Sequence, residues 1–293
     1  MKKIILFGST SNIAVELVNF YLRINYEILL IGRKNIINKK HVYFCNLNNP
    51  DKINKKFIKA DLSIYLIHDD SNNIKRNLSL LTMCLDLNKQ LKIKKFIYLS
   101  STHVYKTSSK ISKYNINSDT DKHKYASVKI NSESCVRQFS QNNKLDYIIL
   151  RIPHVLTYNN DRLIILLKKL IILGISVNNS KKNTYITTKF LYLIINHFNN
   201  KSSFNQIYLI SEKMFLSLYD IQKQIMKNNN KELNINILLS KSIYNIFFKF
   251  IKNISKYKRF FINILFYSNI DINFDKKIYD RQKELDKIFS NYD

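Results

Sequence analysis

The residues best suited to chemistry are Tyr125 and Lys129, in the segment YASVK at positions 125–129. Residues four apart lie on the same face of a helix, one turn from each other. A free phenol has a pKa of about 10 and is a poor base at neutral pH, but an adjacent ammonium stabilises the phenolate. The pair therefore predicts an acid/base that exchanges a proton with a substrate hydroxyl or carbonyl. In a chain with 48 Lys and Arg residues this spacing also arises by chance, so its weight depends on neighbouring motifs.

Hydroxyl side chains precede this pair at the end of a predicted strand. The apolar run Phe96–Leu99 is followed by SSTHVY at positions 100–105. Ligands of α/β sheets bind at the carboxyl ends of the strands. We therefore expect Ser101, 24 residues before Tyr125, to hydrogen-bond the same substrate oxygen.

The amino-terminal segment IILFGSTSNIA, residues 4–14, has the form of a strand, a tight turn and a helix. In a dinucleotide site, small residues let the backbone approach the pyrophosphate and the helix N-terminus supplies N–H donors. Gly8, Ser11 and Ala14 are small enough for that approach. An ordinary strand-to-helix turn capped by Ser or Thr explains the segment equally well. If a dinucleotide binds here, Tyr125 supplies the proton that accompanies hydride transfer to or from its nicotinamide.

The second predicted strand ends in Gly32-Arg33-Lys34. An acidic residue at this place would accept a hydrogen bond from the ribose 2′-hydroxyl of NAD. Arg33 instead suits a 2′-phosphate, which favours NADP over NAD. The alternative is a solvated basic loop in a lysine-rich protein.

The elements that would position these residues alternate along the first half of the chain. Apolar runs predict strands, and apolar spacing of three and four predicts helices. The predicted strands cover residues 3–7, 27–31, 41–44, 62–67, 96–99 and 147–150, with helices at 13–22, 77–87 and 125–140. After Pro153 the pattern loosens, with predicted helices at 162–173, 190–198 and 218–226 and a strand at 206–210. This alternation predicts a parallel sheet covered on both faces.

Taken together, these segments resemble the extended branch of the short-chain dehydrogenase/reductase superfamily, namely the NAD-dependent epimerase/dehydratase family acting on nucleotide sugars. The resemblance spans roughly residues 3–280 and includes the interval between Ser101 and Tyr125, which fits the extended branch. The segments that carry it are Gly8–Ala14, Asp61–Ile64, Asn77 at the start of a helix, Tyr98–Tyr105, Tyr125 with Lys129 and Glu133, Leu150–Val155 and Gln206–Ser211.

The resemblance implies an α/β fold: a Rossmann-type doubly wound parallel sheet over residues 1–160, and a small C-terminal α/β substrate lobe and tail over 161–293. It leaves open whether part of this second segment returns to the sheet. It implies an NAD(P)-dependent epimerase or ketoreductase acting on a nucleotide-activated sugar in cell-surface polysaccharide synthesis. Its catalytic set would be Ser101, Tyr125 and Lys129, with Tyr125 as acid/base. The cofactor-binding residues would be Gly8, Ser11, Asn12 and Ile13 at the pyrophosphate, Arg33 at the adenosine ribose, Asn46, Leu47 and Ile67 nearby, and Tyr125, Lys129 and Ile152 on the nicotinamide side.

Four departures from the family pattern bear on this expectation. Only Gly8 remains of three glycines, and Asn46 stands where an acidic residue is usual. Ile67-His68 replaces a pair of small residues beside the cofactor. Thr102-His103 replaces the acidic pair of the 4,6-dehydratases, so dehydration is the least expected reaction. The eroded glycine motif leaves open a non-catalytic or regulatory dinucleotide-binding protein of the same fold.

Composition limits the partners. The formal net charge is +27, but Lys, Asn and Ile are abundant from end to end while Gly (3) and Pro (2) are scarce. This pattern indicates a chain-wide drift rather than a basic patch for nucleic acid, and an anionic small-molecule substrate fits the positive field equally well. No nucleic-acid partner is expected, and the sequence leaves open whether the protein forms a homodimer.

The sequence gives little indication of membrane insertion, disulfide bonds or metal binding. No apolar run approaches the 18 residues of a membrane span, and the start of the chain does not resemble a secretory signal. The three cysteines have no metal or redox spacing. Together with the preceding observations, they predict a cytoplasmic protein with reduced thiols. Residues 242–267 are basic and amphipathic, which suits either peripheral membrane contact or packing on the protein itself. The scattered histidines, among them His123, and the pairs Asp69-Asp70 and Asp119/Asp121 predict no metal site, and the aspartates are expected to be solvated.

Overall fold

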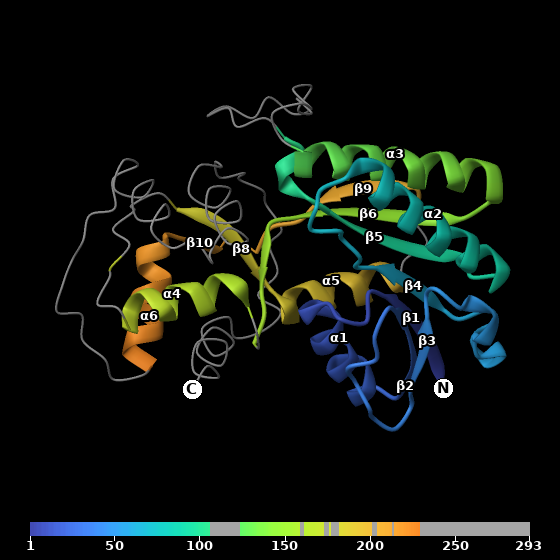
Figure 1. Ribbon diagram of the computed structural model, residues 1–293, viewed down its shortest axis with the longest axis horizontal. Coiled ribbons are helices and arrows are strands. Elements are labelled where there is room, and N and C mark those ends of the chain that lie inside the picture. The colour runs from blue at the N-terminus through green and yellow to red at the C-terminus, as the bar shows by residue number, and fades with distance from the viewer. Residues whose placement is uncertain are drawn as a thin grey trace. The chain divides into compact units, whose positions relative to one another are not determined.

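The computed structural model describes residues 1–105, 124–158, 161–172, 176, 182–200, 204–212 and 214–228 (Figure 1). Its residues fall into two compact units. The first holds the described residues up to Pro153 together with Thr188–Ile210, and the second holds His154–Thr187 and the residues from Ser211 onward. The amphipathic segment 242–267, the C-terminal tail, His123, Asp119 and Asp121 lie outside the described residues.

The first unit is built on a seven-stranded parallel sheet with the order β3-β2-β1-β4-β5-β6-β9. Its strands are β1 (Lys2–Phe7), β2 (Tyr26–Gly32), β3 (Val42–Asn46), β4 (Leu62–Tyr65), β5 (Lys95–Ser101), β6 (Asp146–Ile152) and β9 (Gln206–Leu209). The chain runs outward from β1 to β3 and then returns to β4 on the other side of β1. This reversal makes the carboxyl ends of β1 and β4 the place where a doubly wound sheet binds its ligand.

Helices cover both faces of this sheet (Figure 1). The helices α1 (Asn12–Arg23) and α5 (Thr188–Asn199) lie together on one face, and α2 (Ile74–Gln90) and α3 (Lys124–Asn143) lie together on the other. Side chains alternate between the faces of a strand, so Ile5 and Phe7 pack with Leu85 of α2 in the core cluster. Ile4 and Leu6 of the same strand are also fully buried. Burial on both faces explains why the strands appear in the sequence as unbroken apolar runs.

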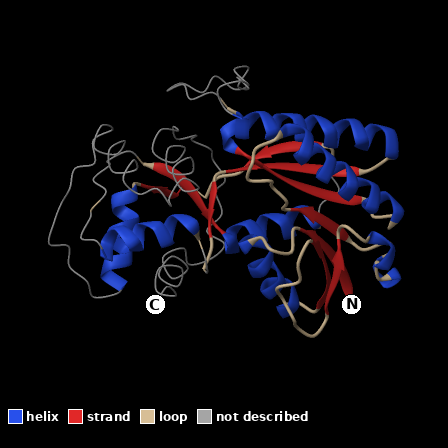
Figure 2. Ribbon diagram, viewed as in Figure 1, coloured by secondary structure: helices blue, strands red, loops and turns tan. Residues whose placement is uncertain are grey.

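The second unit contains a three-stranded sheet with the order β10-β8-β7 (Figure 2). The strand β8 (Asn183–Thr187) pairs in parallel with β7 (His154–Leu156) and antiparallel with β10 (Met214–Leu216). The helices α4 (Arg162–Ile172) and α6 (Leu218–Asn228) pack against each other. Across the described residues, no helix combines the length and apolar character needed to cross a membrane.

The predicted α/β class is confirmed, and each strand and helix expected before Pro153 is present, with ends that differ by a few residues. The pattern did not predict β7, β8 and β10, which are short and lack a clear alternation. Asn77 was expected to open a helix, and this prediction is wrong: α2 begins at Ile74, and the Asn73 side chain caps it by accepting a hydrogen bond from the N–H of Arg76 (3.0 Å). Asn73 and Asn77 lie one turn apart, and Asn at either position is a favourable helix N-cap. Local sequence therefore does not decide which of the two residues caps the helix, and tertiary contacts do.

Candidate active site

The parallel sheet brings the candidate residues to one edge of the first unit. Ser101 ends β5, and Ile152 ends the neighbouring strand β6, where the two residues are direct register partners. Gly8 follows β1, and Ile67 and His68 follow β4. Since every strand of this sheet is parallel, all of these positions lie at carboxyl ends.

Tyr125 lies in the first turn of α3, with a half-buried side chain. Its hydroxyl is hydrogen-bonded to Ser101. Two imidazoles meet its ring edge-on: His68, with centroids 4.9 Å apart, and His103, with centroids 5.6 Å apart. Burial raises the pKa of the Tyr125 phenol, and the hydrogen bond with Ser101 opposes that rise only in part.

Lys129 lies one turn further along α3 and is buried. Its Nζ donates a hydrogen bond to the carbonyl oxygen of Leu99 (2.9 Å) and lies 5.8 Å from the centroid of the Tyr125 ring. Burial lowers the pKa of Lys129 to about 8, against the opposing effect of the Glu133 carboxylate. The spacing argument expected Lys129 to lower the pKa of Tyr125, but in this structure that pKa is raised. The physical reason is desolvation, which disfavours both the phenolate and the ammonium.

Ser101 links the strand to the turn that follows it. Its Oγ accepts a hydrogen bond from the N–H of His103 (3.2 Å), and so caps the short turn Thr102–Val104. The same Oγ lies 2.9 Å from Nδ1 of His103. The Ser101 side chain therefore contacts both a phenol and an imidazole.

A buried ion pair lies beneath these groups. The Glu133 carboxylate binds Arg151 through two contacts, Oε1 to Nε (3.0 Å) and Oε2 to Nη2 (2.7 Å). Ser100 donates to Oε1 of Glu133 (2.5 Å), and Nη1 of Arg151 donates to the Tyr105 hydroxyl (2.9 Å). Burial alone would lower the pKa of Arg151, but its bonds to Glu133 and Tyr105 raise it overall. The pair ties α3 to β5 and β6 next to Lys129, Ser101 and Ile152.

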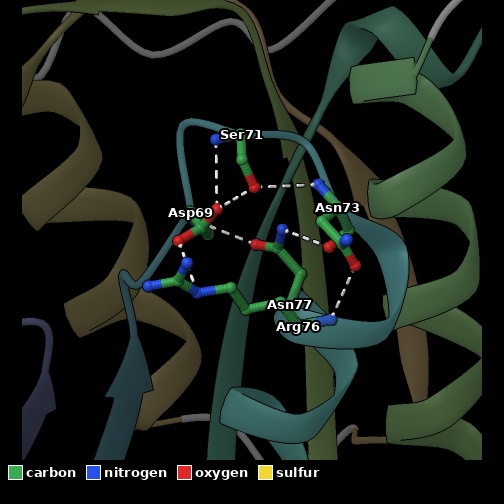
Figure 3. A network of polar contacts seen from close by, with 5 residues as sticks. All are labelled: Asp69, Ser71, Asn73, Arg76 and Asn77. Atoms are coloured by element: carbon green, nitrogen blue, oxygen red, sulfur yellow. Dashed lines mark hydrogen bonds and ion pairs between the residues drawn. The ribbon is translucent and has the colours of Figure 1, made fainter.

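The loop between β4 and α2 is held by a polar network (Figure 3). The Asp69 carboxylate pairs with Nε of Arg76 (3.0 Å) and accepts a hydrogen bond from the N–H of Ser71 (3.0 Å). Asn77 accepts from the N–H of Asp69 (2.9 Å) and donates to the carbonyl of Asn73 (2.9 Å). Asp69 was expected to be solvated without a partner, and this expectation is wrong because the turn brings Arg76 of α2 back to it.

This network braces His68, which directly precedes Asp69. Nε2 of His68 lies 2.9 Å from Oδ1 of Asn72 in the same loop. Burial, together with the nearby charge of Lys129, lowers the pKa of His68 to about 4. His68 therefore presents a neutral imidazole to Tyr125 at neutral pH. No sequence signal placed His68 and His103 against the Tyr125 ring, because they belong to separate loops.

The turn after β1 fits a phosphate-bearing ligand. Gly8 has φ +114°, and a Cβ there would lie 3.2 Å from the backbone carbonyl carbon of Leu66. Ser11 occupies the N-cap of α1, but its side chain makes no capping hydrogen bond. The N–H groups of the first turn, which include those of Asn12 and Ile13, are not used by the hydrogen bonds that run along a helix. A diphosphate is the type of anion that such N–H groups bind, aided by the helix dipole.

The other predicted cofactor residues differ in their surroundings. Arg33, after β2, and Asn46, at the end of β3, are exposed. Ile67 is half-buried and Ile152 is buried. Leu47 packs in the hydrophobic core and its N–H donates to Gly32 (2.9 Å), so a contact of its side chain with the cofactor stays a prediction. Within the described part of the chain, no group of three His, Cys, Asp or Glu side chains is arranged to hold a metal ion.

Comparisons with known proteins bear on this arrangement. The NAD dependent epimerase/dehydratase family matches residues 4–184 of the chain. Curated protein sequences contain no significant match. The solved UDP-N-acetylglucosamine 4-epimerase from Methanobrevibacter ruminantium, in complex with UDP-N-acetylmuramic acid, has a TM-score of 0.74 at 14% identity, covering 99% of this chain and 98% of its own.

Two further solved structures are similar. The UDP-glucose 4-epimerase from Thermotoga maritima with UDP-glucose has a TM-score of 0.72 at 12% identity, covering 99% of this chain and 98% of its own. The dTDP-glucose 4,6-dehydratase from Bacillus anthracis with NAD has a TM-score of 0.72 at 14% identity, covering 100% and 96%. At these identities the structural likeness establishes the fold. Since the family match covers more than half of the sequence, the chain belongs to the NAD-dependent epimerase/dehydratase family of enzymes.

Proposed function

We propose that this protein is an NAD(P)-dependent epimerase or ketoreductase acting on a nucleotide-activated sugar. The observation that carries the proposal is the cluster of Ser101, Tyr125 and Lys129 at the carboxyl edge of the sheet, in the same unit as the Gly8 turn. Family membership and the UDP-sugars named for the similar structures support the substrate class. In this proposal the second unit supplies the sugar-nucleotide lobe, since Thr188–Ile210 belongs to the first unit.

Each member of the cluster has a separate task. Tyr125 exchanges a proton with the substrate hydroxyl or carbonyl, and Ser101 hydrogen-bonds the same oxygen. Lys129 supports the charge of the phenolate and binds the nicotinamide ribose. The bound nicotinamide supplies the hydride chemistry, and a positive charge when oxidised. That charge would favour the phenolate, which burial in this structure disfavours.

Dehydration is disfavoured by the turn after Ser101. Thr102-His103 stands where the 4,6-dehydratases carry an acidic pair, so the carboxyl groups for that reaction are missing at these positions. Epimerisation and keto-reduction need only the proton and hydride steps above.

The choice between NAD and NADP rests on Arg33. Its guanidinium is exposed after β2 and suits bidentate binding of a 2′-phosphate. We expect NADP to bind more tightly than NAD, and Arg33→Ala to remove that preference with little effect on NAD. If the ratio of NADP to NAD affinity is the same in the wild type and in Arg33→Ala, Arg33 belongs to the solvated surface and does not bind the cofactor.

The test begins with binding of NAD(H) and NADP(H), followed by turnover of UDP-, dTDP- and GDP-sugars. Tyr125→Phe should retain cofactor affinity while turnover falls by about 10²–10⁴-fold, the range for loss of a general acid/base. Tyr208→Phe is the matched control, because the Tyr208 hydroxyl bonds Gln206 on β9. If Tyr125→Phe binds the cofactor and turns over as fast as the wild type, Tyr125 has no part in the mechanism. Salt-sensitive binding to vesicles or DNA without cofactor uptake would overturn the proposal as a whole.

A further inference from the structure

Three side chains form a continuous hydrogen-bonded path at the carboxyl end of β5. The Tyr125 hydroxyl is bonded to Ser101, and Oγ of Ser101 lies 2.9 Å from Nδ1 of His103. The His103 ring stands edge-on to the Tyr125 ring at 5.6 Å, and its backbone N–H also bonds Oγ of Ser101. The imidazole is therefore held at both its backbone and its ring.

The order of groups along this path suits proton movement. A serine hydroxyl donates one hydrogen bond and accepts others, so it can pass a proton between two neighbours. Imidazole is the side chain that ordinarily changes its charge near neutral pH. Ser101, in the middle of the path, is buried, whereas Tyr125 and His103 at its two ends are both half-buried.

The other titratable groups packed here are less suited to this task. His68, from the loop after β4, meets the Tyr125 ring edge-on, and its pKa lies at about 4. Lys129, on α3, has its Nζ bonded to the Leu99 carbonyl. Glu133 is held by Arg151 and Ser100. Apart from Tyr125 itself, His103 is the titratable group among these that is bonded directly to Ser101.

We infer that His103 is the outer member of a proton relay through which Tyr125 exchanges its proton with solvent by way of Ser101. The inference rests on the proposed function and deepens it toward keto-reduction. When a substrate carbonyl is reduced, its carbon receives hydride from the reduced nicotinamide and its oxygen receives the Tyr125 proton. Tyr125 then takes a proton from Ser101, Ser101 takes one from Nδ1 of His103, and His103 is reprotonated from water. Oxidation runs the same path in reverse.

This relay separates the two proposed reactions. Epimerisation returns the proton to the oxygen that lost it, so it needs no net exchange with solvent. Each turnover of keto-reduction consumes one proton from water, and the relay supplies it. A marked dependence of turnover on His103 therefore favours net reduction of a sugar ketone.

The first experiment uses an NMR titration of the imidazoles and needs no substrate. In the wild type, Nδ1 of His103 should show the chemical shift of a hydrogen-bonded nitrogen. Ser101→Ala should move the midpoint of the His103 titration and leave that of His197, on α5, unchanged. An unchanged His103 midpoint in Ser101→Ala would overturn the relay, whether or not a sugar substrate is found. Tyr125→Phe is the second variant, and it should alter the His103 titration while keeping the Ser101 hydroxyl.

The second experiment compares His103→Gln with His68→Gln, since both imidazoles contact the Tyr125 ring and, of these two, His103 is the one bonded to Ser101. His103→Gln should keep its cofactor Kd, lower kcat for carbonyl reduction by about 10²-fold, and lose the pH dependence of kcat near neutrality. Added imidazole should restore part of the turnover in His103→Ala. Equal kcat values and pH profiles in His103→Gln and the wild type would overturn the relay. If cofactor binds and Tyr125→Phe turns over as fast as the wild type, it is the proposed function that fails, and the NMR result still decides the relay.

Discussion

Replacing Lys129 by Met should change how the stability of the fold depends on pH. The side chain is buried, with 6% of its surface exposed, and burial lowers its pKa from an ordinary 10.5 to about 8. Each pKa unit corresponds to 1.36 kcal/mol, so below pH 8 the fold carries a penalty of about 3 kcal/mol for holding the ammonium. Methionine has a similar length and no charge, which removes that penalty.

The direction follows from proton linkage. Between pH 8 and 10.5 the unfolded chain holds the Lys129 proton while the folded chain has released it. Stability rises with pH wherever the unfolded state binds more protons. Across this window the free energy of unfolding of the wild type should therefore rise by about 3 kcal/mol relative to Lys129→Met. The lost hydrogen bond to Leu99 adds an offset that is nearly constant with pH, so the slope is the decisive quantity.

The assay is urea unfolding followed by far-ultraviolet circular dichroism from pH 7 to 11. Lys89→Met, at an exposed position in the last turn of α2, serves as the control for removing an ammonium from the surface. The free energy of unfolding of the wild type minus that of Lys129→Met should rise with pH. The same difference for Lys89→Met should stay constant. A constant difference for Lys129→Met would show that burial does not perturb this lysine, and the reasoning about the Tyr125 environment would fall with it.

Three further predictions concern the groups around this lysine. Glu133→Gln leaves the buried Arg151 without its counter-charge and should destabilise the protein by about 3–5 kcal/mol. The control Glu27→Gln, in a more exposed ion pair, should cost less than about 1 kcal/mol. Equal losses of unfolding free energy on urea unfolding would refute the role of the buried pair in stability. Gly8→Ala places a Cβ at φ +114° and should cost about 1–3 kcal/mol, so an unchanged thermal midpoint would mean that the turn relaxes freely. His68, whose pKa falls from 6.5 to about 4, stays neutral in the fold while the unfolded chain takes up a proton. The wild type should therefore lose about 3 kcal/mol relative to His68→Phe as pH drops from 6.5 to 4, and parallel acid-unfolding curves would contradict this.

Local pattern was sufficient to predict most of the first unit. The strands β1, β2 and β5 are buried on both faces, so each appears in the sequence as an apolar run of strand length. Tyr125 and Lys129 share a helix face because four residues make about one turn. Such properties depend on neighbours within a few positions, and the order of the elements then predicts the parallel sheet and the edge that collects Ser101 and Gly8.

Long-range contacts decided the rest. The ion pair of Glu133 with Arg151 joins α3 to β6, and the two imidazoles beside Tyr125 come from loops after different strands. No spacing rule connects such positions, because their proximity depends on how the whole sheet is ordered. The short strands β7 and β8 likewise depend on each other for their hydrogen bonds.

The sequence by itself therefore determined which residue types could carry out proton transfer and at which edge of the sheet they would gather. The tertiary structure decided the pKa values of these residues. Desolvation raises the pKa of Tyr125 and lowers that of Lys129, whereas the spacing of the pair had suggested a phenol made more acidic by its neighbour. A pKa depends on the burial and partners of a group, and these are properties of the folded chain rather than of any segment within it.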